Sequence, residues 1–103
     1  MKAVYTIALK PYEEGYLVRV PDMPSCVTGG KSPDEAVRMA RDAISGCVCV
    51  YEDEGLPVPA ASMPGEVDLE PGEIAALVDI DTVKYRSETD GHTVAGESNI
   101  GNT

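Results

Sequence analysis

The sequence predicts an α+β domain with the order β-β-β-α-β and a helix packed on one face of a small sheet. Three observations support this prediction: a two-residue alternation of β-favouring side chains near the N-terminus, a strong helix-start signal, and a late apolar run. A chain of 103 residues is long enough for one modest hydrophobic core and short for several domains.

Three strands are predicted before the helix. The alternation over residues 2–10 predicts a strand covered on both sides, and residues 11–15 carry the Pro, Gly and acidic residues typical of a hairpin connection. Residues 16–20 form the second strand, and residues 25–28 form a short third one. On the second strand the side chains predicted to face the core are Tyr16, Val18 and Val20.

The helix is the element with the sharpest local signal. Ser32 supplies an N-cap, Pro33 takes the first helical position, and Glu35 completes a capping box. Apolar residues then recur at three- and four-residue steps. The helix is therefore predicted to run to about residue 54, and Gly55 is predicted to end it.

The second half of the chain holds one further predicted strand. Residues 56–72 are rich in Pro, Ala and Gly, which predicts a connection that crosses the surface. Residues 74–80 are nearly continuous in apolar side chains, which is typical of a strand with neighbours on both sides. The folded domain is expected to comprise residues 1–86, and residues 87–103 are expected to form a flexible polar tail.

The charge balance bears on the kind of partner. The chain has 18 acidic and 8 basic residues, a formal net charge of −10. This charge repels the phosphate backbone, so direct binding of DNA or RNA is not expected. An acidic surface suits a basic protein partner, although a need for solubility would explain the charge equally well.

The cysteines and the hydropathy pattern indicate a cytoplasmic protein. Cys26, Cys47 and Cys49 are odd in number, and neither a signal-peptide pattern nor an apolar run of membrane-spanning length is present. Cys47 and Cys49 stand two apart on the predicted helix, which points them about 200° from each other. They cannot hold one ion together, and no metal site or cofactor is predicted.

A vestigial metal-dependent nuclease remains an alternative, because clustered carboxylates hold metal ions in nucleases. Against it, Glu35 is used in helix capping, and the single histidine, His92, falls in the polar tail, so no nucleophile or general base is predicted. The chain is therefore expected not to be an enzyme. The carboxylates that such a site would need are Asp22, Asp34, Glu35, Asp79 and Asp81.

Candidate partner-binding residues lie in the loops at the ends of the sheet, where function is often placed. The acidic members would pair with Arg or Lys of a partner, and Met23 would fill an apolar pocket on it. They fit the role of ordinary turn residues equally well. The set consists of Tyr12, Glu13, Glu14, Asp22, Met23 and Ser25.

Several segments in series resemble the HicB-type antitoxins. The run EGYLVRVPDMPSCVTGG at residues 14–30, followed by SPDEA at residues 32–36, is similar to the signature of that family. Further matches are EDEGLPVP at residues 52–59 and VDID at residues 78–81, so the resemblance covers about residues 1–86. The polar, aperiodic end of the chain differs from the DNA-binding segment of longer members, so DNA binding is not carried over.

The resemblance implies a partial ribonuclease-H-like fold that binds a HicA-type toxin, a small basic ribonuclease. It further implies an antitoxin-like module that neutralises this mRNA-cleaving toxin by covering its active face. The rival interpretation is a stand-alone oligomeric HicB-like domain without a toxin. Unguarded edges at the first or third predicted strand favour a homodimer or homotetramer under either interpretation.

Overall fold

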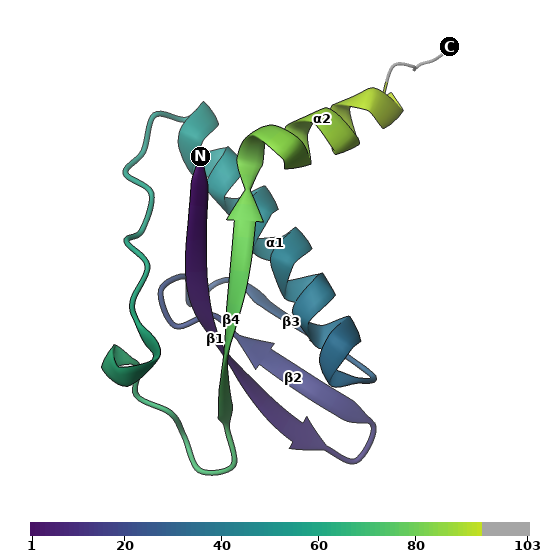
Figure 1. Ribbon diagram of the computed structural model, residues 1–103, viewed down its shortest axis with the longest axis vertical. Coiled ribbons are helices and arrows are strands. Elements are labelled where there is room, and N and C mark those ends of the chain that lie inside the picture. The colour runs from purple at the N-terminus through teal and green to yellow at the C-terminus, as the bar shows by residue number, and fades with distance from the viewer. Residues whose placement is uncertain (94–103) are drawn as a thin grey trace.

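A four-stranded antiparallel sheet with a long helix across one face forms the body of the molecule (Figure 1). The computed structural model describes residues 1–93, the last four of them by backbone only. The sheet order is β3-β2-β1-β4, and the predicted α+β fold with its β-β-β-α-β order is confirmed. The elements are β1 (Lys2–Tyr12), β2 (Gly15–Arg19), β3 (Val27–Gly30), α1 (Pro33–Asp53), the short 3₁₀ helix η1 (Pro64–Glu66), β4 (Ile74–Asp81) and α2 (Thr82–Thr93).

The sheet is built around β1, which pairs antiparallel with two strands in a staggered way. It pairs with β4 over Lys2–Leu9 and with β2 over Ala8–Tyr12. Every residue from Tyr5 to Leu9 is buried, as the sequence predicts for a strand covered on both sides. The hairpin between β1 and β2 is also confirmed, and its Gly15 has a positive φ of 153°.

The hydrophobic core lies between α1 and one face of the sheet. The strands contribute alternate residues to this face, and α1 contributes its predicted apolar stripe. The opposite side of the sheet is called the outer face below. The buried core residues are Tyr5, Ile7, Leu9, Val18, Val20, Met23, Cys26, Ala36, Ala40, Ile44, Val48, Val78 and Ile80.

Helix α1 begins and ends where its sequence signals predict. The Glu35 N–H donates to the Ser32 hydroxyl at 3.1 Å. The Glu35 carboxylate accepts from the Lys31 N–H at 2.6 Å, one residue earlier than a capping box would place this bond. At the other end Gly55 adopts a positive φ of 67° directly after the C-cap residue.

The contact between α1 and β3 leaves no space for a side chain at Gly30. A Cβ on Gly30 would lie 2.5 Å from the backbone nitrogen of Ala36 and 2.9 Å from its Cα. β3 includes both Gly29 and Gly30, whereas the sequence predicts that the strand ends before them. Two glycines in succession allow strand and helix backbones to approach closely here.

The prediction that residues 74–80 have neighbours on both sides is wrong. β4 pairs only with β1 and forms one edge of the sheet, and β3 forms the other. Val78 and Ile80 are buried beneath α1, but Leu77 is 54% exposed on the outer face. The N-terminal strand, expected as a candidate edge, lies between β2 and β4 in the sheet order, but its first half pairs with β4 alone.

Helix α2 occupies part of the segment for which the sequence predicts a tail. Residues 87–93 continue this helix, so the tail prediction is wrong for them, and residues 94–103 lie outside the described part. The Asp81 carboxylate caps α2 by accepting from the N–H groups of Val83 at 3.1 Å and Lys84 at 3.2 Å. Because Val83 is 71% exposed and no apolar stripe follows, periodicity alone gives no signal for this helix.

Polar contacts attach α2 to α1. Arg86 donates to the Cys49 carbonyl at 3.2 Å and pairs with Glu52 at 3.2 Å and with Asp53 at 2.9 Å. Tyr85 lies over Gly46, where an added Cβ would be 3.3 Å from the tyrosine hydroxyl.

Within residues 1–93, no helix is both long enough and apolar enough to cross a membrane.

Residues 56–73, called the connection, lead from α1 to β4 along the open edge of β1 (Figure 1). Its last part lies on the outer face, where the Asp68 carbonyl and Glu73 bind Arg19. The Tyr5 hydroxyl donates to the Pro59 carbonyl at 2.6 Å, and the Thr6 hydroxyl donates to the Ser62 carbonyl at 2.8 Å. Thr6 and Ala8 on the outer face are fully buried.

Replacing Gly30 with Ala should destabilise the domain by about 1–3 kcal/mol, because the new methyl group meets helix backbone that cannot rotate away. Urea unfolding followed by circular dichroism measures the change. Gly65→Ala is the matched control, since a Cβ there meets nothing within 4 Å. Equal stability of the two variants would contradict the close approach of α1 and β3.

Candidate partner-binding surface

The predicted partner-binding residues fall into two groups at opposite ends of β2. Tyr12, Glu13 and Glu14 are at the tip of the β1–β2 hairpin, and the others are in the loop that follows β2. β2 has 5 residues, which corresponds to a separation of about 15 Å at about 3.3 Å per residue. The six residues therefore do not form one cluster.

Met23 is not available to a partner, contrary to its predicted role. Its side chain is 2% exposed and lies in the hydrophobic core. Two backbone hydrogen bonds fold the loop inward around it: the Met23 N–H donates to the Val20 carbonyl at 3.0 Å, and the Cys26 N–H donates to the Met23 carbonyl at 2.8 Å. Its apolar side chain anchors the β2–β3 loop instead.

Asp22 also has a structural role. Its two carboxylate oxygens accept from the backbone N–H and the hydroxyl of Ser62, each at 2.7 Å. This pair of bonds holds the connection against the β2–β3 loop. The exposed members of the predicted set are Tyr12, Glu13, Glu14 and Ser25.

A groove of about 360 Å³ on the outer face lies between the two groups, although none of the six predicted residues lines it. We call it the outer-face groove. Leu17 and Val27 form its exposed apolar part, with 50% and 66% of their surfaces accessible. Pro21 and Pro24 of the β2–β3 loop lie at one end and Lys10 lies toward the hairpin. The other lining residues are Val18, Arg19, Val20, Glu70 and Glu73.

The wall of the outer-face groove contains a bidentate ion pair between Arg19 and Glu73. Arg19 donates to the two carboxylate oxygens of Glu73 at 3.0 and 2.6 Å and to the Asp68 carbonyl at 3.0 Å. The Glu73 side chain is only 4% exposed. Hydrogen bonding from Arg19 lowers the pKa of Glu73 to about 2. The sequence places Arg19 on the outer face but gives no sign of a partner 54 residues away.

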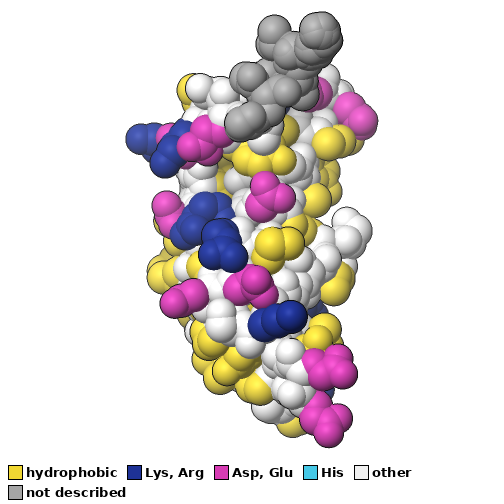
Figure 2. Space-filling model, turned by 90° about the vertical axis from the view of Figure 1, so that its right-hand side faces the viewer, with side chains coloured by type: hydrophobic (Ala, Val, Ile, Leu, Met, Phe, Trp, Pro, Cys, Tyr) yellow, Lys and Arg dark blue, Asp and Glu magenta, His cyan; other side chains and the backbone are white. Residues whose placement is uncertain are grey.

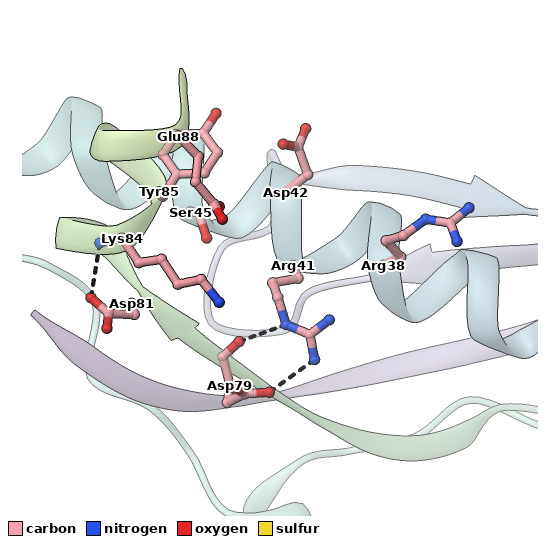
Figure 3. Close-up of a pocket in the computed structure, with 9 residues that line it drawn as sticks. All are labelled: Arg38, Arg41, Asp42, Ser45, Asp79, Asp81, Lys84, Tyr85 and Glu88. Atoms are coloured by element: carbon pink, nitrogen blue, oxygen red, sulfur yellow. Dashed lines mark hydrogen bonds and ion pairs between the residues drawn. The ribbon is translucent and has the colours of Figure 1, made fainter. Parts of the chain in front are cut away.

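A second cavity of about 400 Å³ lies between α1, α2 and the free edge of β4, and we call it the α1–α2 cleft. Figure 3 shows Arg41 reaching from α1 to Asp79, where it donates to the backbone carbonyl at 3.0 Å and to the carboxylate at 2.8 Å. These bonds lower the pKa of Asp79. Figure 2 shows basic and acidic side chains intermixed with apolar ones on this side of the molecule.

Four of the five carboxylates of the nuclease alternative, all except Asp34, are separately engaged. Asp22 bonds to Ser62, Glu35 caps α1, Asp79 pairs with Arg41, and Asp81 caps α2. Among the described residues no three His, Cys, Asp or Glu side chains are placed to hold a metal ion. The side chain of His92 lies outside the described part.

The cysteines are free thiols in or beside the core. Burial raises the pKa of Cys26 to about 12 and also raises the pKa of Cys49. Cys47 is half-buried and packs against the core, as the sequence predicts. Thiols with raised pKa values are poor nucleophiles at neutral pH.

A small α+β domain with an apolar groove between acidic loops has the features of a protein-binding module. The chain belongs to the HicB-like antitoxin family of bacterial toxin-antitoxin systems, whose model matches residues 5–95. It is 36% identical over 75 residues to Antitoxin HicB 2 of Photorhabdus laumondii, an alignment that covers 72% of this chain and 54% of that protein. Antitoxin HicB 1 of the same organism is also 36% identical, over 77 residues. The chain thus spans about half the length of these relatives.

Solved structures agree with this assignment. The N-terminal domain of Burkholderia pseudomallei antitoxin HicB matches with a TM-score of 0.64 and 31% identity, over 77% of this chain and 99% of that one. A chain of the HicA3 and HicB3 toxin-antitoxin complex matches with a TM-score of 0.63 and 26% identity, with the same coverage. A toxin-antitoxin complex from Streptococcus pneumoniae shares the fold, with a TM-score of 0.74 at 17% identity over 100% of this chain and 80% of that one.

Replacing Glu73 with Gln should cost about 2 kcal/mol of stability at pH 7, and the cost should disappear in acid. Because the folded-state pKa of about 2 lies below the ordinary value of 4.5, the stabilisation is complete above pH 4.5 and is lost as the pH falls toward 2. Urea unfolding at several pH values measures it, with Glu54→Gln on an exposed side chain as the control. A difference that stays constant down to pH 2 would contradict this assignment.

Proposed function

We propose that this domain neutralises a HicA-type mRNA-cleaving toxin by covering the toxin's active face. The observation that carries the proposal is membership of the HicB-like antitoxin family, matched over residues 5–95. The similarity to a chain of a HicA3 and HicB3 complex supports a toxin as the partner. The net charge of −10 suits a basic ribonuclease, because complementary charge accelerates association and disfavours wrong partners.

We propose that the exposed residues of the hairpin tip and the β2–β3 loop contribute to this interface. Glu13 and Glu14 are exposed beside Tyr12, a residue type enriched at interfaces, and Ser25 is exposed in the loop at the other end of β2. Asp22 contributes indirectly by fixing the loop to Ser62. These residues would approach basic groups of the toxin.

We propose further that the domain acts without catalysis, in the cytoplasm and as a homodimer or homotetramer. Free thiols suit a reducing compartment. Self-association is supported by the edge strand β4, which exposes Leu77. Arg41 occupies the Asp79 carbonyl at this edge, so strand pairing there would be confined to the first half of β4.

Reversing both hairpin charges, Glu13→Lys with Glu14→Lys, should slow association with the HicA-type toxin of the same genome about tenfold at low salt. Surface plasmon resonance at two ionic strengths measures the rate. The matched control is Glu54→Lys with Glu88→Lys, at the α1–α2 end of the molecule and remote from the hairpin (Figure 1). Equal rates for both variants would exclude the hairpin. Wild-type protein that neither binds nor neutralises the toxin would overturn the proposed function.

The purified chain should not cleave RNA in the presence of Mg²⁺ or Mn²⁺. Asp22 and Asp79 are committed to Ser62 and Arg41 and are not free to bind two metal ions. A fluorescent RNA oligonucleotide followed on a denaturing gel provides the test. Metal-dependent cleavage that Asp79→Asn abolishes would establish the nuclease alternative.

A further inference from the structure

The outer face of the sheet is covered unevenly. Thr6, which bonds to the connection, and Ala8 are fully buried, whereas Leu17 and Val27 on the same face are 50% and 66% exposed. The ladder places Ala8 opposite Arg19, and Arg19 opposite Val27. The exposed apolar area therefore begins directly beside the buried part of one continuous face.

The outer-face groove is held open by the fold. Leu17 pairs with Gly29, which has no side chain to cover it, and an added Cβ at Gly29 would lie 2.7 Å from the Tyr16 carbonyl oxygen. The long side chain of Arg19, which could otherwise fold over the groove, is bound to Glu73 and to the Asp68 carbonyl. A groove that requires no side-chain rearrangement loses little entropy when it binds a ligand.

The charges around the outer-face groove favour a basic occupant. Asp68 and Glu70 are exposed on the connection at one wall, and Glu13 and Glu14 are exposed at the hairpin end. The basic residues nearby are Lys10 in the wall, the ion-paired Arg19, and the exposed Lys31 beside Gly15 at the hairpin end, so the acidic residues remain in excess. A second copy of this chain would bring an identical acidic rim against this one, which is repulsive, and nucleic acid would be repelled likewise.

We propose that the outer-face groove is the main docking site for the toxin, and that it receives an apolar toxin side chain flanked by Lys or Arg. The apolar side chain contacts Leu17 and Val27, and the flanking cations face Glu70 and Glu13. This inference rests on the proposed function and identifies the surface that performs it. Apolar anchors that become fully desolvated contribute most of the affinity at such interfaces.

The test compares two exposed leucines, one in the groove and one outside every surface proposed above. Leu17→Lys places a cation in the groove, and Leu56→Lys makes the same change just after α1, where the leucine is similarly exposed at 48%. We expect Leu17→Lys to weaken the toxin complex by about 30-fold or more in calorimetry and Leu56→Lys by less than about threefold. Val27→Lys is a second groove variant on a different strand, and it should behave like Leu17→Lys.

The outcomes distinguish a failure of the groove assignment from a failure of the proposed function. Circular dichroism and thermal unfolding confirm that each variant is folded, and Val27→Lys replaces Leu17→Lys if the latter is not. Wild-type affinity in the folded groove variants, with the wild type bound, overturns the groove assignment alone. A wild type that does not bind overturns the proposed function as well. A dimer that Leu17→Lys converts to monomer in analytical ultracentrifugation would show that a second copy occupies the groove, which also overturns the inference.

Discussion

The staggered pairing of β1 is the constraint on which the rest of the structure depends. β4 pairs with Lys2–Leu9 and β2 pairs with Ala8–Tyr12, so the first half of β1 has a strand on one side only. Buried polar side chains need hydrogen-bond partners, and the Pro59 and Ser62 carbonyls of the connection accept from the hydroxyls of Tyr5 and Thr6 along this open side. The bonds from Ser62 to Asp22 then tie the same segment to the β2–β3 loop. The stagger thus determines both where the outer face is covered and where the groove begins.

Features determined within one or two turns of chain could be predicted from the sequence. The cap at Ser32 and the positive φ at Gly55 depend on neighbouring residues, and both appear as predicted. The inward and outward alternation on β2 was equally readable, because one buried face fixes strand register. Helix α2 lacked an apolar stripe, but Asp81 directly before a run of helix-compatible residues is a capping signal that could have identified it.

The site was less predictable, because its parts meet only through tertiary structure. The Arg19–Glu73 pair spans 54 residues and the Asp22–Ser62 pair spans 40, and neither has a sequence signal. Apolar composition alone could not distinguish an edge strand from a central one in β4, since its outer face is left partly open. Met23 was misplaced for a related reason: a methionine between two prolines resembles an exposed loop residue until the turn directs it into the core.

The ion pairs within the fold determine which charged side chains remain exposed and unpaired in this protein of net charge −10. Arg19, Arg41 and Arg86 each bind an acidic group of another element, so these basic side chains are used in holding the fold together. The acidic surplus is left on exposed loops, including the hairpin tip and the connection. Such exposed charge mainly governs the rate and selectivity of encounter, whereas affinity depends on desolvated apolar contact. An acidic rim around a preformed apolar groove therefore supports both fast, selective encounter and affinity on one surface. The internal ion pairs contribute by binding basic side chains that would otherwise offset the acidic rim.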